Sequence, residues 1–131
     1  NRGRHSILGT TGVSSISVPL KTLEKVIEEL LPSESTIDFM KMDVEGYEPF
    51  VLRGGQSVLG RVECMLMEYA PHLIEQSGVD LREFIVNIRS NFSYIYWVSE
   101  TDFVAISVDE VLSRKDAIDL LFSKSPLASI A

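Results

Sequence analysis

The chain has 131 residues, of which 45% are apolar and 24% charged, a composition typical of one soluble globular domain rather than of a disordered or fibrous chain. Its 19 acidic and 12 basic residues give a net charge of −7, and the basic residues are scattered along the chain. Because nucleic-acid binding depends on clustered Lys and Arg, these numbers argue against a nucleic-acid partner.

The single cysteine, Cys64, lies in an apolar run and is interpreted as a buried core thiol. The sequence shows no disulfide framework, no signal peptide and no apolar run near the length of about 18 residues that spans a membrane. We therefore expect a cytoplasmic protein with no membrane partner. Residues 1–131 are expected to form a single α/β domain.

The first half of the chain contains three expected elements after a polar segment, residues 1–15, that is rich in Gly, Ser and Thr and is expected to be loop. A helix follows Thr22, its expected N-cap, and stops before Pro32. Residues 37–44 form a nearly continuous apolar run, which suits a strand covered on both faces. Residues 47–52 then indicate a short helix that ends at two glycines.

The second half alternates in the same way. The expected elements, in chain order, are a strand at 62–70, a helix opened by Asp80 as N-cap with Glu83 completing a capping box, a strand at 94–100, a local pairing partner at 102–107, a short helix at 109–114 and a last strand at 117–123. Strands that alternate with helices predict an α/β fold with a mostly parallel sheet and helices on both faces.

Acidic residues stand where two of these strands end. Asp43 and Glu45 close the first strand, Glu68 ends the second, and Tyr69 and His72 follow directly. In an open α/β sheet, ligands bind beyond the carboxyl ends of the strands. We therefore expect these five residues at one edge of the sheet, beside a ligand.

Ordinary structural roles compete with this interpretation. Acids in the first turn of a helix are stabilised by the helix macrodipole by ~0.3 to 1 kcal/mol, which accounts for Glu48 and leaves both interpretations open for Glu45. His72 could serve as a base or be a plain surface residue. Lys41 inside an apolar strand suggests a partner carboxylate, for which Glu68 on the next strand is the candidate.

The stretch "IDFMKMDVEGYEPFVLRGG" followed by "VECMLMEYAPH" resembles the signature of FkbM-type S-adenosylmethionine-dependent methyltransferases. The matching residues are Lys41, Asp43, Val44, Glu45, Gly46, Glu48, Val51, Leu52, Gly54 and Glu68. Upstream "SVPLKTLEKVIEE" and the tail "AIDLLFSK" are also similar to the family, so the resemblance covers nearly the whole chain. It implies a Rossmann-like methyltransferase sheet whose last strand is antiparallel.

The resemblance has one departure. Members of the family begin with a strand and a Gly-x-Gly turn that holds the cofactor, whereas Gly3, Gly9 and Gly12 lie in the expected loop with no strand before them. The chain therefore resembles the second half of such a domain, and we expect a fragment or a truncated product. Loss of the first half would expose the edge of the strand at 37–44, which predicts a homodimer through that edge.

The resemblance implies S-adenosylmethionine as cofactor and O-methylation of a sugar or another small-metabolite hydroxyl. Asp43 is the first candidate for the general base, for orienting the substrate and for a cofactor contact, with Lys41 as a catalytic residue beside it and Glu68 as further support. The expected substrate-binding residues are Glu45, Glu68, Tyr69 and His72.

Other functions compete with methyl transfer as interpretations of the same residues. No catalytic metal is expected, although Asp43, Glu45 and Glu68 could in principle hold a divalent ion. One alternative is a non-enzymatic α/β remnant that acts as an interaction or oligomerisation domain. A metal-dependent phosphotransfer or nuclease domain is the weakest alternative, because the acidic chain repels nucleic acid.

Overall fold

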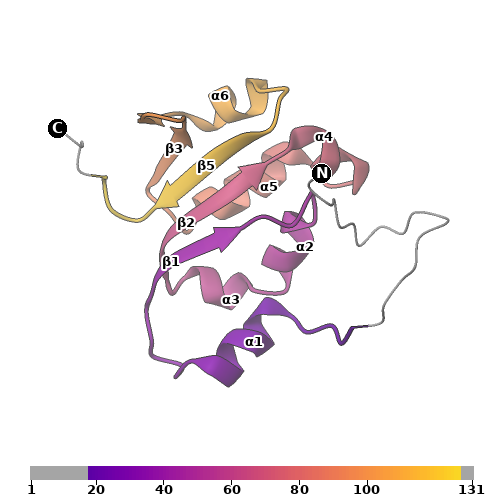
Figure 1. Ribbon diagram of the computed structural model, residues 1–131, viewed down its shortest axis with the longest axis vertical. Coiled ribbons are helices and arrows are strands. Elements are labelled where there is room, and N and C mark those ends of the chain that lie inside the picture. Colours follow the sequence, from indigo (N-terminus) through magenta and orange to yellow (C-terminus); the bar gives the residue numbers. More distant parts are fainter. Residues whose placement is uncertain (1–17, 128–131) are drawn as a thin grey trace.

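The computed structural model describes residues 18–127, which form a mixed α/β fold (Figure 1). Helices and strands alternate along most of this part of the chain, as the sequence predicted. The elements are α1 (Leu23–Leu30), β1 (Ile37–Met42), α2 (Glu48–Arg53), α3 (Gln56–Leu59), β2 (Val62–Tyr69), α4 (Pro71–Gln76), α5 (Leu81–Arg89), β3 (Tyr94–Val98), β4 (Phe103–Ala105), α6 (Val108–Ser113) and β5 (Ile118–Ser123). The expected loop at residues 1–15 lies outside the described residues.

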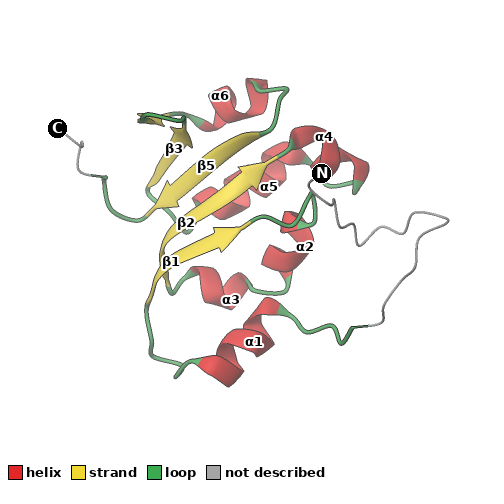
Figure 2. Cartoon of the chain, viewed as in Figure 1, coloured by secondary structure: helices red, strands yellow, loops and turns green. Residues whose placement is uncertain are grey.

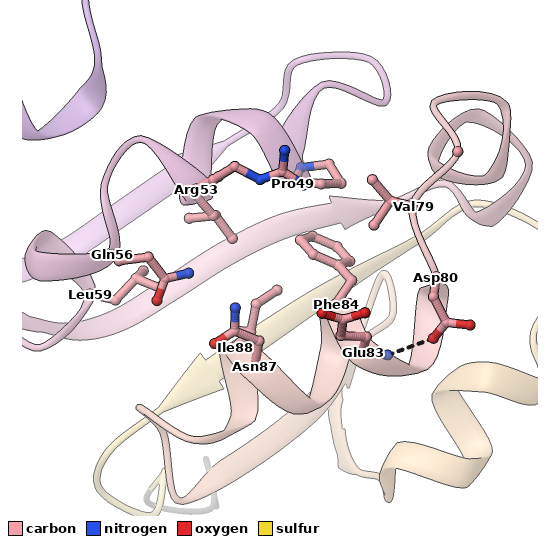
Figure 3. Close-up of a pocket in the computed structure, with 12 residues that line it drawn as sticks. Pro49, Arg53, Gln56, Leu59, Val79, Asp80, Glu83, Phe84, Asn87 and Ile88 are labelled. Carbon is pink, nitrogen blue, oxygen red and sulfur yellow. Dashed lines mark hydrogen bonds between the residues drawn. The ribbon is translucent and has the colours of Figure 1, made fainter.

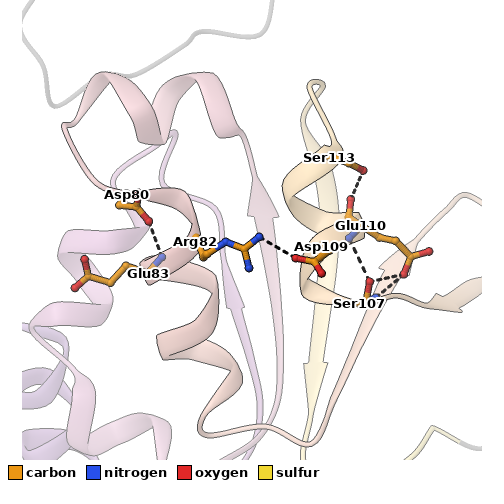
Figure 4. Close-up of polar contacts among 7 residues, drawn as sticks. All are labelled: Asp80, Arg82, Glu83, Ser107, Asp109, Glu110 and Ser113. Atoms are coloured by element: carbon orange, nitrogen blue, oxygen red, sulfur yellow. Dashed lines mark hydrogen bonds and ion pairs between the residues drawn. The ribbon is translucent and has the colours of Figure 1, made fainter.

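The helix starts follow from side chains that cap free backbone N–H groups. The Thr22 hydroxyl accepts a hydrogen bond from the Lys25 amide at 3.3 Å, and the Asp80 carboxylate accepts one from the Glu83 amide at 2.8 Å, so both predicted N-caps are confirmed. The reciprocal capping box occurs instead at α6, between Ser107 and Glu110 (Figure 4).

Two short helices were not predicted. α4 begins at Pro71, whose fixed φ suits the first helical position, and α3 has a single turn between Gly55 and Gly60. Both are too short for helical periodicity to reveal them.

An ion pair connects two of the later helices. Arg82 of α5 lies 2.8 Å from Asp109 of α6, which joins the two helices at their exposed ends (Figure 4).

The described strands form a mixed sheet in the order β1-β2-β5-β3-β4 (Figure 2). β1 and β2 are parallel, whereas β5 is antiparallel to both of its neighbours, β2 and β3, and β4 is antiparallel to β3. The expectation of an antiparallel last strand is therefore confirmed. The expectation of a mostly parallel sheet is wrong, because β5 inserts between β2 and β3 and the chain returns through the β3–β4 hairpin.

One face of the sheet carries the core. Buried strand residues on this face join one apolar cluster with residues of every helix from α2 to α6. The strand members are Met42, Met65, Met67, Tyr69, Ile95, Leu120 and Phe122, and the helix members are Leu52, Val58, Leu59, Ile74, Phe84, Ile85, Ile88 and Val111. In Figure 1, α5 accordingly lies behind β2 and β5. Burial of this apolar surface is the main stabilising contribution to the fold.

The opposite face of the sheet, which we call the open face, is formed by the alternate residues of the same strands. On β1 it includes Phe39, which is 54% exposed, and Lys41; on β2 it includes Cys64, Leu66 and Glu68. Among the described residues no helix contributes to this face. The expectations of helices on both faces and of a β1 strand covered on both faces are therefore wrong for residues 18–127.

Cys64 also differs from its expected place. Cys64 belongs to the open face, whereas the next residue, Met65, is buried on the other face. The Cys64 side chain is only partly buried and is not part of the core. Partial burial raises the pKa of its thiol, and a hydrogen bond with Ser123 works in the other direction. A raised pKa keeps the thiol protonated and therefore weakly nucleophilic.

Candidate active site

Three acids lie side by side where β1 and β2 end. Met42 pairs with Met67 in the parallel register, so the next residues along these strands, Asp43 and Glu68, are neighbours. Glu68 is in turn the direct partner of Asp119 on β5. Together with Glu45, these residues form what we call the acidic rim: Asp43, Glu45, Glu68 and Asp119. The predicted meeting of Asp43 and Glu68 at one edge of the sheet is confirmed.

A tight turn carries the first two acids of the rim. Glu45 has φ 54° and Gly46 has φ 92°, so two consecutive residues adopt left-handed backbone conformations. The Tyr47 amide donates to the Val44 carbonyl at 3.2 Å across this turn. A side chain at position 46 would bring a Cβ atom to within 2.6 Å of the Leu73 Cβ, so glycine is required where the turn meets α4.

Glu48 supports the turn from inside the protein. Its side chain is only 1% exposed, and its Oε1 accepts a hydrogen bond from the Val44 amide at 3.1 Å. The other oxygen, Oε2, is buried and has no hydrogen-bond partner among the described residues. The sequence analysis explained Glu48 as an ordinary acid in the first turn of a helix. The preference for acids at this position applies to exposed side chains and does not reveal whether a given side chain is buried.

The carboxylates of the rim repel one another. Partial burial raises the pKa of Glu68, and the negative charges of its neighbours raise it further; in order of effect they are Asp43, Glu45, Glu48 and Asp119. Asp119 was not among the predicted site residues. It is the acid of the last strand, but only the antiparallel register, which the sequence does not reveal, brings it opposite Glu68.

Lys41 contacts a different acid from the one predicted. Its Nζ lies 3.5 Å from Asp43 Oδ2, and both side chains are about half exposed, at 62% and 47%. The expected pair with Glu68 is corrected accordingly. An exposed pair at this distance contributes little to stability, ~0 to 1 kcal/mol, so its significance lies in placing a positive charge beside the rim.

Two other predicted substrate-binding residues have contrasting positions. Tyr69 has an exposed fraction of 0% and belongs to the apolar core, so the expectation that it contacts a substrate is corrected: alternation along β2 turns it away from Glu68. Its hydroxyl has no hydrogen-bond partner within the described part of the chain. His72, in contrast, is exposed in the first turn of α4, directly after the end of β2.

Two pockets of the described region lie away from the rim. A pocket of about 230 Å³ opens between α2, α3 and α5, with Arg53 and Gln56 on one side and Glu83 and Asn87 on the other (Figure 3). A second pocket of about 340 Å³ lies between α1 and α3, beside Glu28 and Arg61. We favour the rim as the site in spite of these pockets, because strained backbone and mutually repelling carboxylates are characteristic of functional sites.

Neither a cluster of metal-ligand side chains nor a membrane-spanning helix occurs in the described part of the chain. Within residues 18–127, no group of three or more His, Cys, Asp and Glu side chains is arranged to hold a metal ion. No helix in the same range combines the length and apolar character needed to cross a membrane.

The family of the chain follows from comparison with known proteins. The family model described as Methyltransferase FkbM domain matches residues 1–112, so the chain belongs to this methyltransferase family. The match includes Lys41, Asp43, Glu45, Glu48 and Glu68, the residues that carried the resemblance in the sequence. No curated protein and no solved structure matches the chain.

Proposed function

We propose that the chain serves in S-adenosylmethionine-dependent O-methylation of a hydroxyl group on a sugar or another small metabolite. Membership of the FkbM methyltransferase family is the observation that carries this proposal. The acidic rim supports its location, because it gathers Asp43, Glu45 and Glu68 where an open α/β sheet binds ligands.

The rim residues fit this cofactor by charge. S-adenosylmethionine carries a positive sulfonium and an ammonium group, and it supplies the methyl group when bound. The exposed carboxylate of Asp43 would contact these positive groups, and Glu68 stands beside it.

Asp43 is proposed to accept the proton of the acceptor hydroxyl. It is exposed, lies directly after the end of β1, and its Oδ2 lies 3.5 Å from the Lys41 Nζ, so a positive charge stands beside the carboxylate. General-base catalysis of this kind contributes typically ~10² to 10⁴-fold. Glu45, Glu68 and His72 are proposed to bind the acceptor, whose hydroxyl groups can donate hydrogen bonds to the carboxylates.

Calorimetric titration with S-adenosylmethionine tests the proposal. Asp43→Asn keeps the shape of the side chain but removes its charge, and Asp38→Asn is the matched control, an exposed acid near the other end of the same strand. We expect binding to the wild-type protein, at least ~10-fold weaker binding to Asp43→Asn and unchanged binding to Asp38→Asn. Absence of heat with the wild-type protein, or equal loss in both variants, would reject the proposal. A screen of sugar and metabolite hydroxyls then identifies the acceptor.

A second candidate function is self-association through β1. Among the described strands β1 has β2 as its one neighbour, so no described strand pairs with its other edge, and Phe39 on the same strand is 54% exposed. A long unpaired edge with an exposed aromatic residue is a template for pairing with a second chain. This observation favours a homodimer, with or without catalysis.

Light scattering separates this candidate from a monomer. Phe39→Lys places a charge on the edge strand and should convert a dimer into a monomer, whereas Val86→Lys changes an equally exposed residue, 49% exposed on α5, and should leave the mass unchanged. A wild-type protein that stays monomeric at all concentrations, or a dimer that survives Phe39→Lys, would count against association through β1.

A further inference from the structure

The turn that holds Asp43 and Glu45 contains a backbone conformation that its own residues do not favour. Glu45 is not a glycine, yet it has φ 54°, a conformation that costs roughly 1 to 2 kcal/mol relative to ordinary backbone. Residues held in such conformations persist only where the surrounding structure enforces them. Some contact must therefore hold the backbone between positions 43 and 46.

Glu48 makes the contact that fits this requirement. Its Oε1 accepts from the Val44 amide at 3.1 Å, and Val44 is the residue between Asp43 and Glu45. The bond reaches back four residues, from the first position of α2 across the whole turn. Pro49 and Leu52 of α2 are buried, so the carboxylate that receives the bond is fixed to the core.

The burial of Glu48 is hard to explain by stability alone. The side chain is 1% exposed and its Oε2 lacks a partner within residues 18–127. A buried polar atom without a partner is destabilising, and an apolar residue of similar size would fill the space without that cost. Only a side chain with a hydrogen-bond acceptor can make the contact to the Val44 amide.

From these observations we infer that Glu48 is a positioning residue for the acidic rim. Its hydrogen bond to the Val44 amide fixes the turn, and through the turn it sets the directions in which the Asp43 and Glu45 carboxylates point. The functional part of this inference rests on the proposed methyltransferase site, whereas the conformational part can be tested without a ligand.

Two variants separate the hydrogen bond from simple space filling. Glu48→Gln keeps an oxygen acceptor, and Glu48→Met has similar volume but no oxygen; Glu83→Met, at an exposed first-turn acid of α5, is the control. Amide exchange of Val44 and the backbone coupling constant of Glu45 are measured by NMR. We expect exchange at Val44 to accelerate about 10-fold or more in Glu48→Met, with a changed Glu45 coupling, while Glu48→Gln and Glu83→Met retain both values.

The wild-type protein provides a test that does not depend on the stability of a variant. Val44 lies outside β1, so its amide should be protected from exchange only if Glu48 holds it. Rapid wild-type exchange at Val44, or a Glu48→Met protein with an unchanged turn, would overturn the inference.

Titration of the same proteins with S-adenosylmethionine then tests the functional part. A positioning role predicts that Glu48→Met weakens binding about 10-fold or more at a temperature where it is fully folded, and that Glu48→Gln restores it to within a few-fold. Equal binding by a folded Glu48→Met would reject the positioning role. If the wild-type protein shows no binding, the proposed function fails, and the NMR data still decide whether Glu48 holds the turn.

Discussion

The two faces of the same sheet differ in burial, most clearly along β1 and β2. On the covered face, Met65, Met67, Leu120 and Phe122 are each 0% exposed and pack against the helices. On the open face, residues one position away along β1 and β2 are exposed or partly exposed, among them Phe39 and Lys41. Alternation along each strand thus divides the chain into a part that stabilises the fold and a part that is available for chemistry.

The acidic rim lies where this difference matters most. Glu68 stands between the buried Met67 and Tyr69, so its position at the edge of a rigid core is fixed while its carboxylate faces outward. Sites built on packed strands hold their side chains more precisely than sites on loops alone. Packing on the covered face therefore fixes the backbone position of Glu68, and the open face leaves its carboxylate directed away from the core.

The largest effect is expected from truncating the covered face. Phe122→Ala removes a fully buried ring that packs near Phe92, with ring centroids 6.0 Å apart, and should lower the free energy of unfolding by about 3 to 5 kcal/mol. Phe39→Ala removes the same atoms from the open face and should cost less than about 1 kcal/mol. Urea denaturation measures both. Equal losses would show that the open face is covered in solution.

A smaller effect is expected at the turn that connects β1 to α2. Gly46→Ala meets both a left-handed φ of 92° and the Leu73 Cβ at 2.6 Å, and should cost about 2 to 4 kcal/mol. Gly78→Ala has a similar φ, 78°, but no atom within 4 Å, and should cost only about 1 kcal/mol. Thermal unfolding of both variants measures the difference. If Gly46→Ala lowers the stability no more than Gly78→Ala does, the close contact between the turn and α4 does not exist.

The smallest effect is a pH dependence at the rim. The folded pKa of Glu68 is raised, so between the unfolded pKa, about 4.3, and the folded pKa the folded state binds more protons than the unfolded state. The free energy of unfolding should therefore fall as pH rises through this window, and the loss remains at higher pH. Glu68→Gln should remove this contribution, whereas Glu63→Gln, at the other end of β2, should retain it. Unfolding curves recorded at several pH values give the free energy of unfolding as a function of pH. If this free energy changes with pH to the same extent in Glu68→Gln and in the wild type, the crowding of carboxylates around Glu68 is contradicted.

Patterns local in the sequence predicted the structure well. Thr22 and Asp80 begin their helices as expected, since capping depends on residues only a few positions apart. The apolar runs that were expected to be strands form β1, β2, β3 and β5, because apolar runs of this length are typical of strands. The meeting of Asp43 and Glu68 followed from the rule that parallel neighbours end at the same edge.

Features that depend on distant pairing could not be predicted. An apolar strand with both faces covered and an apolar strand with one face open have similar sequences, so the exposure of Phe39 and the partial exposure of Cys64 were missed. Asp119 joins the rim only through the β2–β5 register. The burial of Glu48 depends on how α2 packs, which no pattern within the motif reveals.

Chemical-shift mapping with S-adenosylmethionine tests the central claim most directly, because it compares the rim with the pocket between α2, α3 and α5 in a single titration. A site at the rim predicts that the backbone amides of residues 43–46 and 68–70 shift on binding, while those of Gln56, Glu83 and Asn87 stay in place. Shifts confined to the pocket residues, or none at either place at saturating cofactor, would contradict a methyltransferase site at the acidic rim.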